Sequence, residues 1–326
     1  MKKGITVIVC TYNGALRLPE TLAHLAAQSF NQTISWEIIV VDNDSTDDSA
    51  VIAKETWKKY RVSSSVPFRV IREIRQGKIY ALEQAFSLAE FEYSIICDDD
   101  NWLDKNYVER MYAILEEHPE AGAAGGDGIA VSENGKFPDW FQDFEEGYAV
   151  GKQGTVAGDI SSRGHLWGAG MGTRTKLYQQ MYSNFPSLLV GRMGGKLTAG
   201  EDSEYCQRLL LKGYTLYYDP CLRFQHYMSL ARLNLAYKAK LFDGFKEGNK
   251  ILDKYYLANR IKHKIYQRPI KKISLLFLSP FRILISATDK KEKELDVFTL
   301  LTSLSIRQNS VMGKIKRFIN TDTTSI

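Results

Sequence analysis

The sequence predicts an α/β fold with a mixed, mostly parallel sheet flanked by helices, followed by a helical C-terminal extension. Three observations support this prediction. Short apolar runs rich in β-branched residues alternate along the chain with segments whose apolar residues recur at helical spacing. Acidic and other turn residues follow several of these apolar runs. Strands that alternate with helices are expected to pair in parallel and to form an open sheet.

The predicted elements alternate in the first part of the chain. Strands are expected at Ile5–Cys10, Glu37–Val41, Phe68–Glu73 and Tyr93–Cys97. Helices are expected at Leu16–Gln28, Asp48–Tyr60, Ile79–Ala89 and Asn106–Glu117. The glycine-rich and aromatic segment Gly122–Gly172 is predicted to be irregular around a site. A helix at Ser203–Lys212 and a strand at Tyr214–Tyr218 then complete a first domain, residues 1–230.

The composition is that of a folded globular protein. The chain has 326 residues, of which 44% are hydrophobic and 25% charged, which suits one large domain with an appendage. Its net charge of +5 is too small to indicate a nucleic-acid partner. The four cysteines are far apart and form no CxxC pair, so we expect buried free thiols in a reducing compartment and no zinc site.

The chain carries no evident targeting or membrane-spanning segment. The run Ile5–Cys10 is too short for a signal peptide, and no stretch offers the roughly 20 apolar residues of a spanning helix. We therefore expect a cytoplasmic protein.

Residues 231–326 are predicted to be a helical extension that is both basic and apolar. Six basic residues lead into the apolar stretch Ile273–Ala287: Arg260, Lys262, Lys264, Arg268, Lys271 and Lys272. Such a segment suits an anionic membrane surface, here the inner face of the cytoplasmic membrane. Packing of the same segment on the first domain is an equally weighted alternative.

Three adjacent carboxylates, Asp98, Asp99 and Asp100, follow the fourth predicted strand. They repel one another, and partial burial strengthens that repulsion. A hard divalent cation such as Mn2+ or Mg2+ relieves it, because it binds one or two carboxylates and completes its shell with phosphate oxygens and water. The alternative is a cap on the following helix, but Asp104 can serve there and a cap needs one carboxylate. We therefore favour a metal site.

Two other strand exits also carry candidate ligand-binding side chains. Thr11-Tyr12-Asn13 ends the first predicted strand, and Asp42 ends the second. In open α/β sheets, ligands collect at the carboxyl ends of the strands. Asp42 can accept a hydrogen bond from a nucleobase NH, and Tyr12 can stack on a base. Ordinary turn chemistry and packing against the first helix compete with these roles, and these residues alone do not decide.

Glu201-Asp202 precedes the predicted helix Ser203–Lys212. Alone, Asp202 suits an N-cap. Together with the triple aspartate, it suits a general base that accepts a proton from an acceptor hydroxyl.

Two further features have competing structural explanations. The segment Trp167-Gly168-Ala169-Gly170 places an aromatic face beside backbone without bulk, which suits a sugar, although a packed loop explains it nearly as well. His226 is either a metal or diphosphate ligand or, as a lone histidine more often is, a structural residue.

Taken in order, these motifs resemble those of the family 2 glycosyltransferases. Each piece is weak, but the ordered set is specific and covers residues 4–230. The matching pieces are Val7-Ile8-Val9-Cys10-Thr11-Tyr12-Asn13, Ile38-Ile39-Val40-Val41-Asp42-Asn43-Asp44-Ser45, Gly77-Lys78 with Ala81-Leu82, Asp98-Asp99-Asp100-Asn101, Gly168-Ala169-Gly170 and Glu201-Asp202.

The resemblance implies a GT-A fold, in which a Rossmann-like sheet binds a nucleoside-diphosphate sugar. The implied nucleotide-sugar contacts are Thr11, Tyr12, Asn13, Asp42, Lys78, Asp98 and Asp99. The implied contacts to the donor and acceptor sugars are Trp167, Gly168, Ala169, Gly170 and Glu201. The implied metal ligands for Mn2+ or Mg2+ are Asp100, Asp98 and His226, and the implied catalytic base is Asp202. In one place the chain departs from the family, because Ala81-Leu82-Glu83 stands where Ala-Arg-Asn is common, so we expect Arg75 or Lys78 to supply that contact.

The resulting hypothesis is an inverting, metal-dependent hexosyltransferase. It would move a sugar from a nucleoside-diphosphate sugar, with UDP-sugars favoured over GDP- or dTDP-sugars, to a hydroxyl of a saccharide acceptor. The C-terminal extension favours a lipid-linked acceptor in bacterial surface polysaccharide biosynthesis, with peripheral membrane contact and no nucleic acid. The alternative is a non-catalytic member of the fold that binds a nucleotide sugar or glycan, or acts as a scaffold. A nucleotidyltransferase is disfavoured, because Thr11-Tyr12-Asn13-Gly14 stands where such enzymes carry a phosphate loop.

Overall fold

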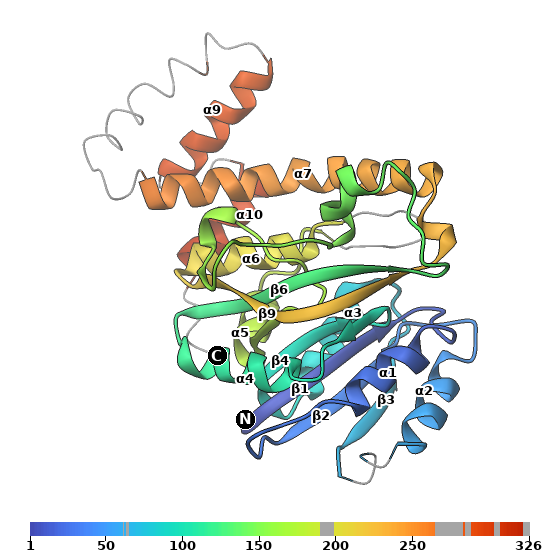
Figure 1. Cartoon of the computed structure of the whole chain (residues 1–326). Helices are drawn as coiled ribbons and strands as arrows, with labels where there is room; N and C mark the ends of the chain where they lie inside the picture. The colour runs from blue at the N-terminus through green and yellow to red at the C-terminus, as the bar shows by residue number, and fades with distance from the viewer. Residues whose placement is uncertain are drawn as a thin grey trace.

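The computed structural model describes residues 1–60, 62, 65–189, 199–264, 283, 288–302 and 307–321. The described strands form one mixed sheet in the order β3-β2-β1-β4-β8-β6-β9-β5, with β7 beside β9 (Figure 1). Its parallel part consists of β1 (Lys2–Thr11), β2 (Trp36–Asp42), β3 (Phe68–Arg72) and β4 (Phe91–Asp98).

The second part of the sheet is built around two long parallel strands, β6 (Ala121–Ser132) and β9 (Thr215–Met228). The short strand β8 (Gly172–Arg174) joins the two parts, because it pairs antiparallel with both β4 and β6. At the other side, β5 (Asn101–Leu103) and β7 (Gly158–Asp159) pair antiparallel with β9. The result is the mixed, mostly parallel sheet that the sequence predicts.

Helices cover both faces of the sheet (Figure 1). One face packs against α1 (Leu18–Ala26), α2 (Ser49–Lys58) and α4 (Tyr107–Glu117). The other packs against α3 (Lys78–Leu88), α5 (Thr175–Tyr182) and α6 (Glu201–Lys212). Val7 and Ile8 of β1 point to opposite faces and are both fully buried. This two-sided burial explains why the strand is a continuous apolar run rather than an alternating one.

The register of the parallel strands brings their polar ends together. Thr11 at the end of β1 lies opposite Asp42 at the end of β2, and Cys10 lies opposite Asp98 at the end of β4. These strand exits therefore line one edge of the sheet, the edge at which ligands collect in such folds. This edge is the floor of the site described below.

The prediction of irregular structure over Gly122–Gly172 is wrong in its first part, where β6 forms a buried strand. Glycine and alanine have a low intrinsic preference for strands, so the sequence conceals it. At Gly126 the backbone comes so close to β9 that a Cβ atom would lie 1.8 Å from the carbonyl oxygen of Leu222. The glycines therefore serve close strand packing. Beyond β6 the segment contains β7 and two short helices, η2 (Gln142–Tyr148) and η3 (Ser161–Arg163).

The C-terminal extension is helical where the structure describes it. After η4 (Leu230–Arg232), the long helix α7 (Leu235–Lys264) packs along α6. The helices α9 (Thr288–Leu301) and α10 (Val311–Asn320) pack on α7 and on each other, and the apolar side chains of α10 join the core above α6. Within the described ranges, no helix is long and apolar enough to cross a membrane.

Two sequence predictions, on membrane contact and on the cysteines, are not confirmed in full. The segment proposed for membrane contact, with Arg268, Lys271, Lys272 and nearly all of Ile273–Ala287, lies outside the described residues. The four cysteines are free, as expected, but they are not all buried: Cys97 and Cys206 are buried, Cys10 is half-buried and Cys221 is exposed.

Candidate functional site

A large cavity of about 1230 Å3 opens above the carboxyl ends of β1 and β4. Its floor is formed by the first strand exit and the triple aspartate. Helix α7 forms another part of its wall, with Leu241, Phe242, Phe245 and Tyr256 among the lining residues. Most of the predicted site residues line it: Thr11, Tyr12, Lys78, Asp98, Asp99, Asp100, Trp167, Gly168, Ala169, Glu201, Asp202 and His226.

Three predicted residues do not line this cavity and instead make local contacts. Asn13, with a φ of 49°, accepts a hydrogen bond of 2.8 Å from the Thr46 amide. Asp42 is buried and accepts one of 3.0 Å from the Ser45 amide. The carbonyl of Gly170 accepts a hydrogen bond of 2.8 Å from the Tyr107 hydroxyl. These contacts shape the loops around the floor.

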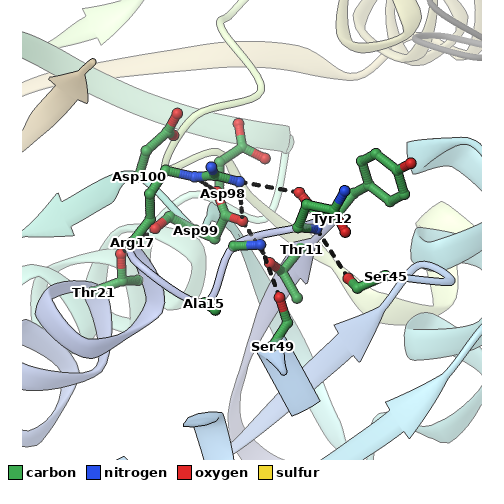
Figure 2. A network of polar contacts seen from close by, with 12 residues as sticks. Thr11, Tyr12, Ala15, Arg17, Thr21, Ser45, Ser49, Asp98, Asp99 and Asp100 are labelled. Carbon is green, nitrogen blue, oxygen red and sulfur yellow. Dashed lines mark hydrogen bonds and ion pairs between the residues drawn. The ribbon is translucent and has the colours of Figure 1, made fainter. Parts of the chain in front are cut away.

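Asp99, the middle carboxylate, is turned toward α1 and fully engaged by protein donors (Figure 2). Arg17 binds both of its oxygens, at 2.9 and 2.8 Å. The Thr11 hydroxyl donates a hydrogen bond of 2.5 Å to Oδ2, and the Thr21 hydroxyl donates one of 2.7 Å to the Asp99 carbonyl. Asp99 therefore ties the end of β4 to α1 and to the end of β1.

Asp98 forms an ion pair with Lys78, the first residue of α3. Gly77 precedes this helix with a φ of 131°, a conformation that favours glycine. Burial alone would lower the pKa of Lys78, but Asp98, Glu201 and Cys10 together outweigh it, so the pKa lies above its ordinary value. The side chain is thus a permanent cation on the cavity floor.

Asp100 is buried and surrounded by positive or hydrogen-bonding groups. Its Oδ2 lies 2.5 Å from Nη1 of Arg232, and its Oδ1 lies 3.4 Å from Nε2 of His226. Burial alone would raise the pKa of Asp100, but His226 and Arg232 outweigh it and hold that pKa well below its usual range. The carboxylate is therefore ionised.

His226 faces the carboxylate of Asp100 with its Nε2. Its Nδ1 lies 2.7 Å from the carbonyl oxygen of Tyr148. Because a carbonyl can only accept, Nδ1 carries the proton and Nε2 keeps its lone pair when the ring is neutral. His226 belongs to β9 and faces Asp100 because it lies opposite Asn101 in the β5–β9 pairing.

Asp98, Asp100 and His226 supply the types of ligand atom that a hard divalent cation binds. Their present positions, however, do not form a metal site. In the described part of the chain, no three such side chains converge closely enough to hold a metal ion. The reason is visible at each carboxylate, because Lys78 pairs with Asp98 and Arg232 with Asp100. At Asp100, a cation would have to take the place of the Arg232 guanidinium.

Asp202 lies in the first turn of α6 and lines the same cavity. Gly200 occupies the N-cap, so the alternative that Asp202 is the cap is wrong. Its Oδ2 accepts a hydrogen bond of 2.8 Å from the Gly168 amide, and its Oδ1 accepts one of 2.7 Å from the Ser203 amide. Two backbone donors thus fix the orientation of this carboxylate beside the segment Trp167–Gly170.

The first part of the chain, which contains the triple aspartate, matches a known family. The family model described as "Glycosyl transferase family 2" matches residues 6–180. The chain belongs to glycosyl transferase family 2. Its similarity to curated proteins covers shorter segments. It is 31% identical over 113 residues to the poly(ribitol-phosphate) β-N-acetylglucosaminyltransferase TarS of Staphylococcus aureus, and the match covers 35% of this chain and 19% of that relative.

Solved structures show the same fold at low sequence identity. The structure of S. aureus TarS 1–349 in complex with UDP has a TM-score of 0.52 and 16% identity, and the match covers 97% of this chain and 89% of that one. The mannosyltransferase PcManGT of Pyrobaculum calidifontis, in complex with GDP-Man and Mn2+, has a TM-score of 0.51 and 18% identity, with 98% and 85% covered. The fold of this family 2 glycosyltransferase is therefore GT-A, as the motifs imply.

Sequence reasoning missed several residues of the transferase's cavity. Arg17 and Arg232 hold two of the three aspartates, and neither belongs to a motif that marks it. His165 lines the cavity near Asp202, and its Nδ1 is buried without a hydrogen-bond partner among the described residues. The apolar side chains of α7 could have been suspected only from the aromatic content of that helix, because its place above the site is a tertiary feature.

Proposed function

We propose that this family 2 glycosyltransferase is an inverting, metal-dependent hexosyltransferase that uses a nucleoside-diphosphate sugar. The observation that carries the proposal is that the triple aspartate and Asp202 line one cavity. Ligand cavities commonly enclose about 300–1,000 Å3, and this one, at about 1230 Å3, has room for a donor and part of an acceptor. A binding module would need no carboxylate held in position by two backbone amides in the same cavity as the triple aspartate.

The chain's own residues suggest how the transfer proceeds. Asp202 accepts the proton of the acceptor hydroxyl, and the resulting oxygen attacks the anomeric carbon from the face opposite the leaving nucleoside diphosphate. The bond to the diphosphate breaks, and the negative charge that develops there is stabilised by Lys78 on the floor. When bound at Asp100, Asp98 and His226, a divalent cation supplies further neutralisation of that leaving group. Inversion of the anomeric configuration follows from the single displacement.

The donor is proposed to be a UDP-sugar, with GDP- and dTDP-sugars as alternatives. A structural neighbour with the same fold is described with UDP, and another with GDP-Man and Mn2+. Thr11 and Tyr12 are the floor residues that we assign to the nucleoside, since both line the cavity and Tyr12 is half exposed. The departure from the family at Ala81-Leu82-Glu83 is proposed to be compensated by Lys78, which lines the cavity, rather than by Arg75, which pairs with Glu73 away from the lining residues.

The acceptor is proposed to be a lipid-linked saccharide of bacterial surface polysaccharide biosynthesis. The relative TarS is named as acting on poly(ribitol-phosphate), but the matched segment is a small part of that protein. We assign residues 1–230 to catalysis and residues 231–326 to an extension that completes the acceptor end, because α7 forms part of the cavity wall. Peripheral contact with the inner face of the cytoplasmic membrane is part of the same proposal.

Donor binding across a panel of UDP-, GDP- and dTDP-sugars tests this proposal. Binding is measured calorimetrically with and without Mn2+ for the wild type and Asp100→Ala. We expect Mn2+ to strengthen the binding of one donor class in the wild type and not in the variant. NMR of the product made from that donor is expected to show an inverted anomeric centre. Failure of a folded protein to bind any donor would favour a scaffold instead, and retained configuration would exclude the single displacement.

A further inference from the structure

The ion pair between Arg232 and Asp100 is the feature of the cavity that the proposed reaction leaves unused. Arg232 ends the short helix η4, between β9 and α7, and its side chain is 17% exposed. Its Nη1 lies 2.5 Å from Oδ2 of Asp100 and 3.4 Å from Nε2 of His226. These are two of the three groups to which we assign the divalent cation, the third being Asp98. A guanidinium nitrogen thus contacts two of the three proposed metal ligands.

The guanidinium of Arg232 does not use all of its hydrogen-bond donors in the pair with Asp100. Its Nε is buried and has no hydrogen-bond partner among the described residues. Tyr237 is a further neighbour, and its ring centroid lies 5.7 Å from the guanidinium carbon. Burial alone would lower the pKa of Arg232, but Asp100 and the hydroxyl of Tyr237 help to raise it above its ordinary value. A buried arginine normally uses its planar set of donors on one or two acceptors. An arginine with a free buried donor, facing a cavity that is expected to receive a diphosphate, has a second partner available.

We propose that Arg232 is an exchangeable counter-ion of Asp100, which holds the carboxylate in the donor-free protein and moves to the donor's diphosphate when a divalent cation takes its place. This inference rests on the metal-dependent reaction proposed above. Asp100 pairs with Arg232 in the donor-free protein and with the divalent cation in the donor-bound protein. The diphosphate of the bound donor pairs with Arg232. No buried charge is left unpaired at either stage, which would be costly.

The exchange requires little movement of the chain. Arg232 has a long side chain, and its neighbours Leu230 and Ala231 are exposed. The backbone of η4 remains anchored by the Leu230 amide, which donates a hydrogen bond of 3.0 Å to Glu133, and by the Arg232 carbonyl, which accepts one of 3.3 Å from Tyr148. Ser229 and Tyr227, which precede η4, also line the cavity. A change of side-chain rotamer therefore suffices to turn the guanidinium from Asp100 into the cavity.

The exchange predicts two effects on binding affinity. In the absence of a nucleotide, Arg232 competes with the cation, so its removal increases the affinity for Mn2+. In the presence of UDP, the diphosphate draws Arg232 away from Asp100, so the cation and the nucleotide help each other to bind. Such coupling is reciprocal and is measured as the ratio of Mn2+ dissociation constants without and with UDP.

The experiment measures Mn2+ binding by electron paramagnetic resonance of the free ion, with and without UDP, for the full-length protein. The variants are Arg232→Gln, which removes the charge, and Arg232→Lys, which keeps it. Lys246→Gln is the matched control: Lys246 lines the same cavity but pairs with Asp243 at 3.2 Å. Thermal unfolding of each variant confirms that it is folded.

We expect Arg232→Gln to bind Mn2+ alone roughly tenfold or more tightly than the wild type, because the competing state is removed. Its affinity for UDP in the presence of Mn2+ is expected to fall, and the coupling ratio to shrink by a similar factor. Arg232→Lys and Lys246→Gln are expected to stay within about threefold of the wild type for Mn2+ alone. A merely structural arginine would not change the two affinities in opposite directions.

Three outcomes overturn the inference. Equal Mn2+ affinities of the wild type and Arg232→Gln would show that the guanidinium does not compete. Equal tightening by Lys246→Gln would show that general charge in the cavity, rather than occupancy of Asp100, is responsible. In both cases the metal-dependent reaction itself would stand. Absence of Mn2+ binding by every variant, with and without UDP, would overturn the inference together with the metal part of the proposed function.

Discussion

The carboxylate of Asp202 accepts a hydrogen bond of 2.8 Å from the backbone amide of Gly168. This bond joins the first turn of α6 to the loop that contains Trp167, so the proposed base and the proposed sugar-binding segment are held as one unit. Gly168 also approaches closely, since a Cβ at this position would lie 3.2 Å from the Cβ of Asp202. Positioning of this kind favours catalysis, because a general base must be within hydrogen-bond reach of the proton that it accepts.

Replacement of Asp202 by asparagine is the direct test of this base. Asparagine keeps the size of the side chain and can still accept the hydrogen bond from Gly168, but it cannot take up a proton. We therefore expect kcat to fall by about 10²–10⁴-fold, with the dissociation constant of the donor within about threefold of the wild type. Steady-state kinetics and calorimetry measure the two quantities.

The control for this experiment is Asp143→Asn, because Asp143 is an exposed acidic residue of η2 that lines the same cavity. Its activity is expected to stay close to that of the wild type. If Asp202→Asn lost donor binding and thermal stability together with turnover, the carboxylate would be a structural element of α6 rather than a base.

The three adjacent aspartates show how far the sequence carries the site. Their proximity predicts a need for positive charge, and the cavity confirms that they share one floor with Thr11 and Tyr12. The sequence does not reveal that the positive charge comes from the protein itself. Arg17 lies 82 positions from Asp99, and Arg232 lies 132 positions from Asp100. Pairings over such separations are set by the fold, so no local pattern announces them.

The fold shows the same division between local and tertiary information. The strands β1, β2 and β4 are predictable because burial on both faces makes each a continuous apolar run. The strand β6 is concealed because its glycines are selected for close packing on β9, as Gly126 shows against Leu222. Likewise, the helical character of α7 follows from its sequence, whereas its place in the wall of the cavity depends on packing against α6.

Asp99 is expected to contribute more to stability than to chemistry. Its side chain is 9% exposed and receives hydrogen bonds from Arg17 and Thr11. Asp99→Asn removes the charge that holds Arg17, so the free energy of unfolding should fall by about 1–3 kcal/mol. Chemical denaturation measures this change. Calorimetry should show Mn2+ and donor affinities close to those of the wild type.

Asp44→Asn is the surface control, because the pair between Asp44 and Arg72 is solvent-exposed, with the Arg72 side chain 66% exposed. It should change the free energy of unfolding by less than about 1 kcal/mol. A loss of donor affinity in Asp99→Asn at unchanged stability would support the alternative that Asp99 contacts the nucleotide.

The buried pair of Glu204 and Arg208 is expected to hold the surroundings of the base together. Both side chains lie on α6, are at most 2% exposed and are joined at 2.7 Å. Glu204 also accepts hydrogen bonds from the Tyr255 hydroxyl on α7, at 2.8 Å, and from the Leu189 amide, at 2.9 Å. Glu204→Gln leaves Arg208 buried without a counter-charge, so the free energy of unfolding should fall by about 3–5 kcal/mol.

Denaturant unfolding of Glu204→Gln and Glu247→Gln checks this expectation. The pair of Glu247 and Lys250 on α7 is exposed, with side chains 63% and 68% accessible, and its loss should cost less than about 1 kcal/mol. A cost for Glu204→Gln as small as that of the surface control would mean that the network does not anchor α7 to α6.

The last expectation concerns the pH dependence of stability and rests on His165. Burial and the nearby Arg163 lower the pKa of His165, although Asp202 acts in the opposite direction. The unfolded chain, in which histidine has a pKa of about 6.5, therefore binds this proton at a higher pH than the folded protein does. It follows that the contribution of the neutral His165 ring to the free energy of unfolding is fully present above the unfolded-state pKa. This contribution is lost as the pH falls through the folded pKa. His165→Gln should consequently show a shallower decrease in the free energy of unfolding between about pH 7 and pH 5. His263→Gln, at an exposed position near the end of α7, is the matched histidine substitution. Identical slopes in the wild type and His165→Gln would show that this ring is as free to protonate in the folded cavity as in the unfolded chain.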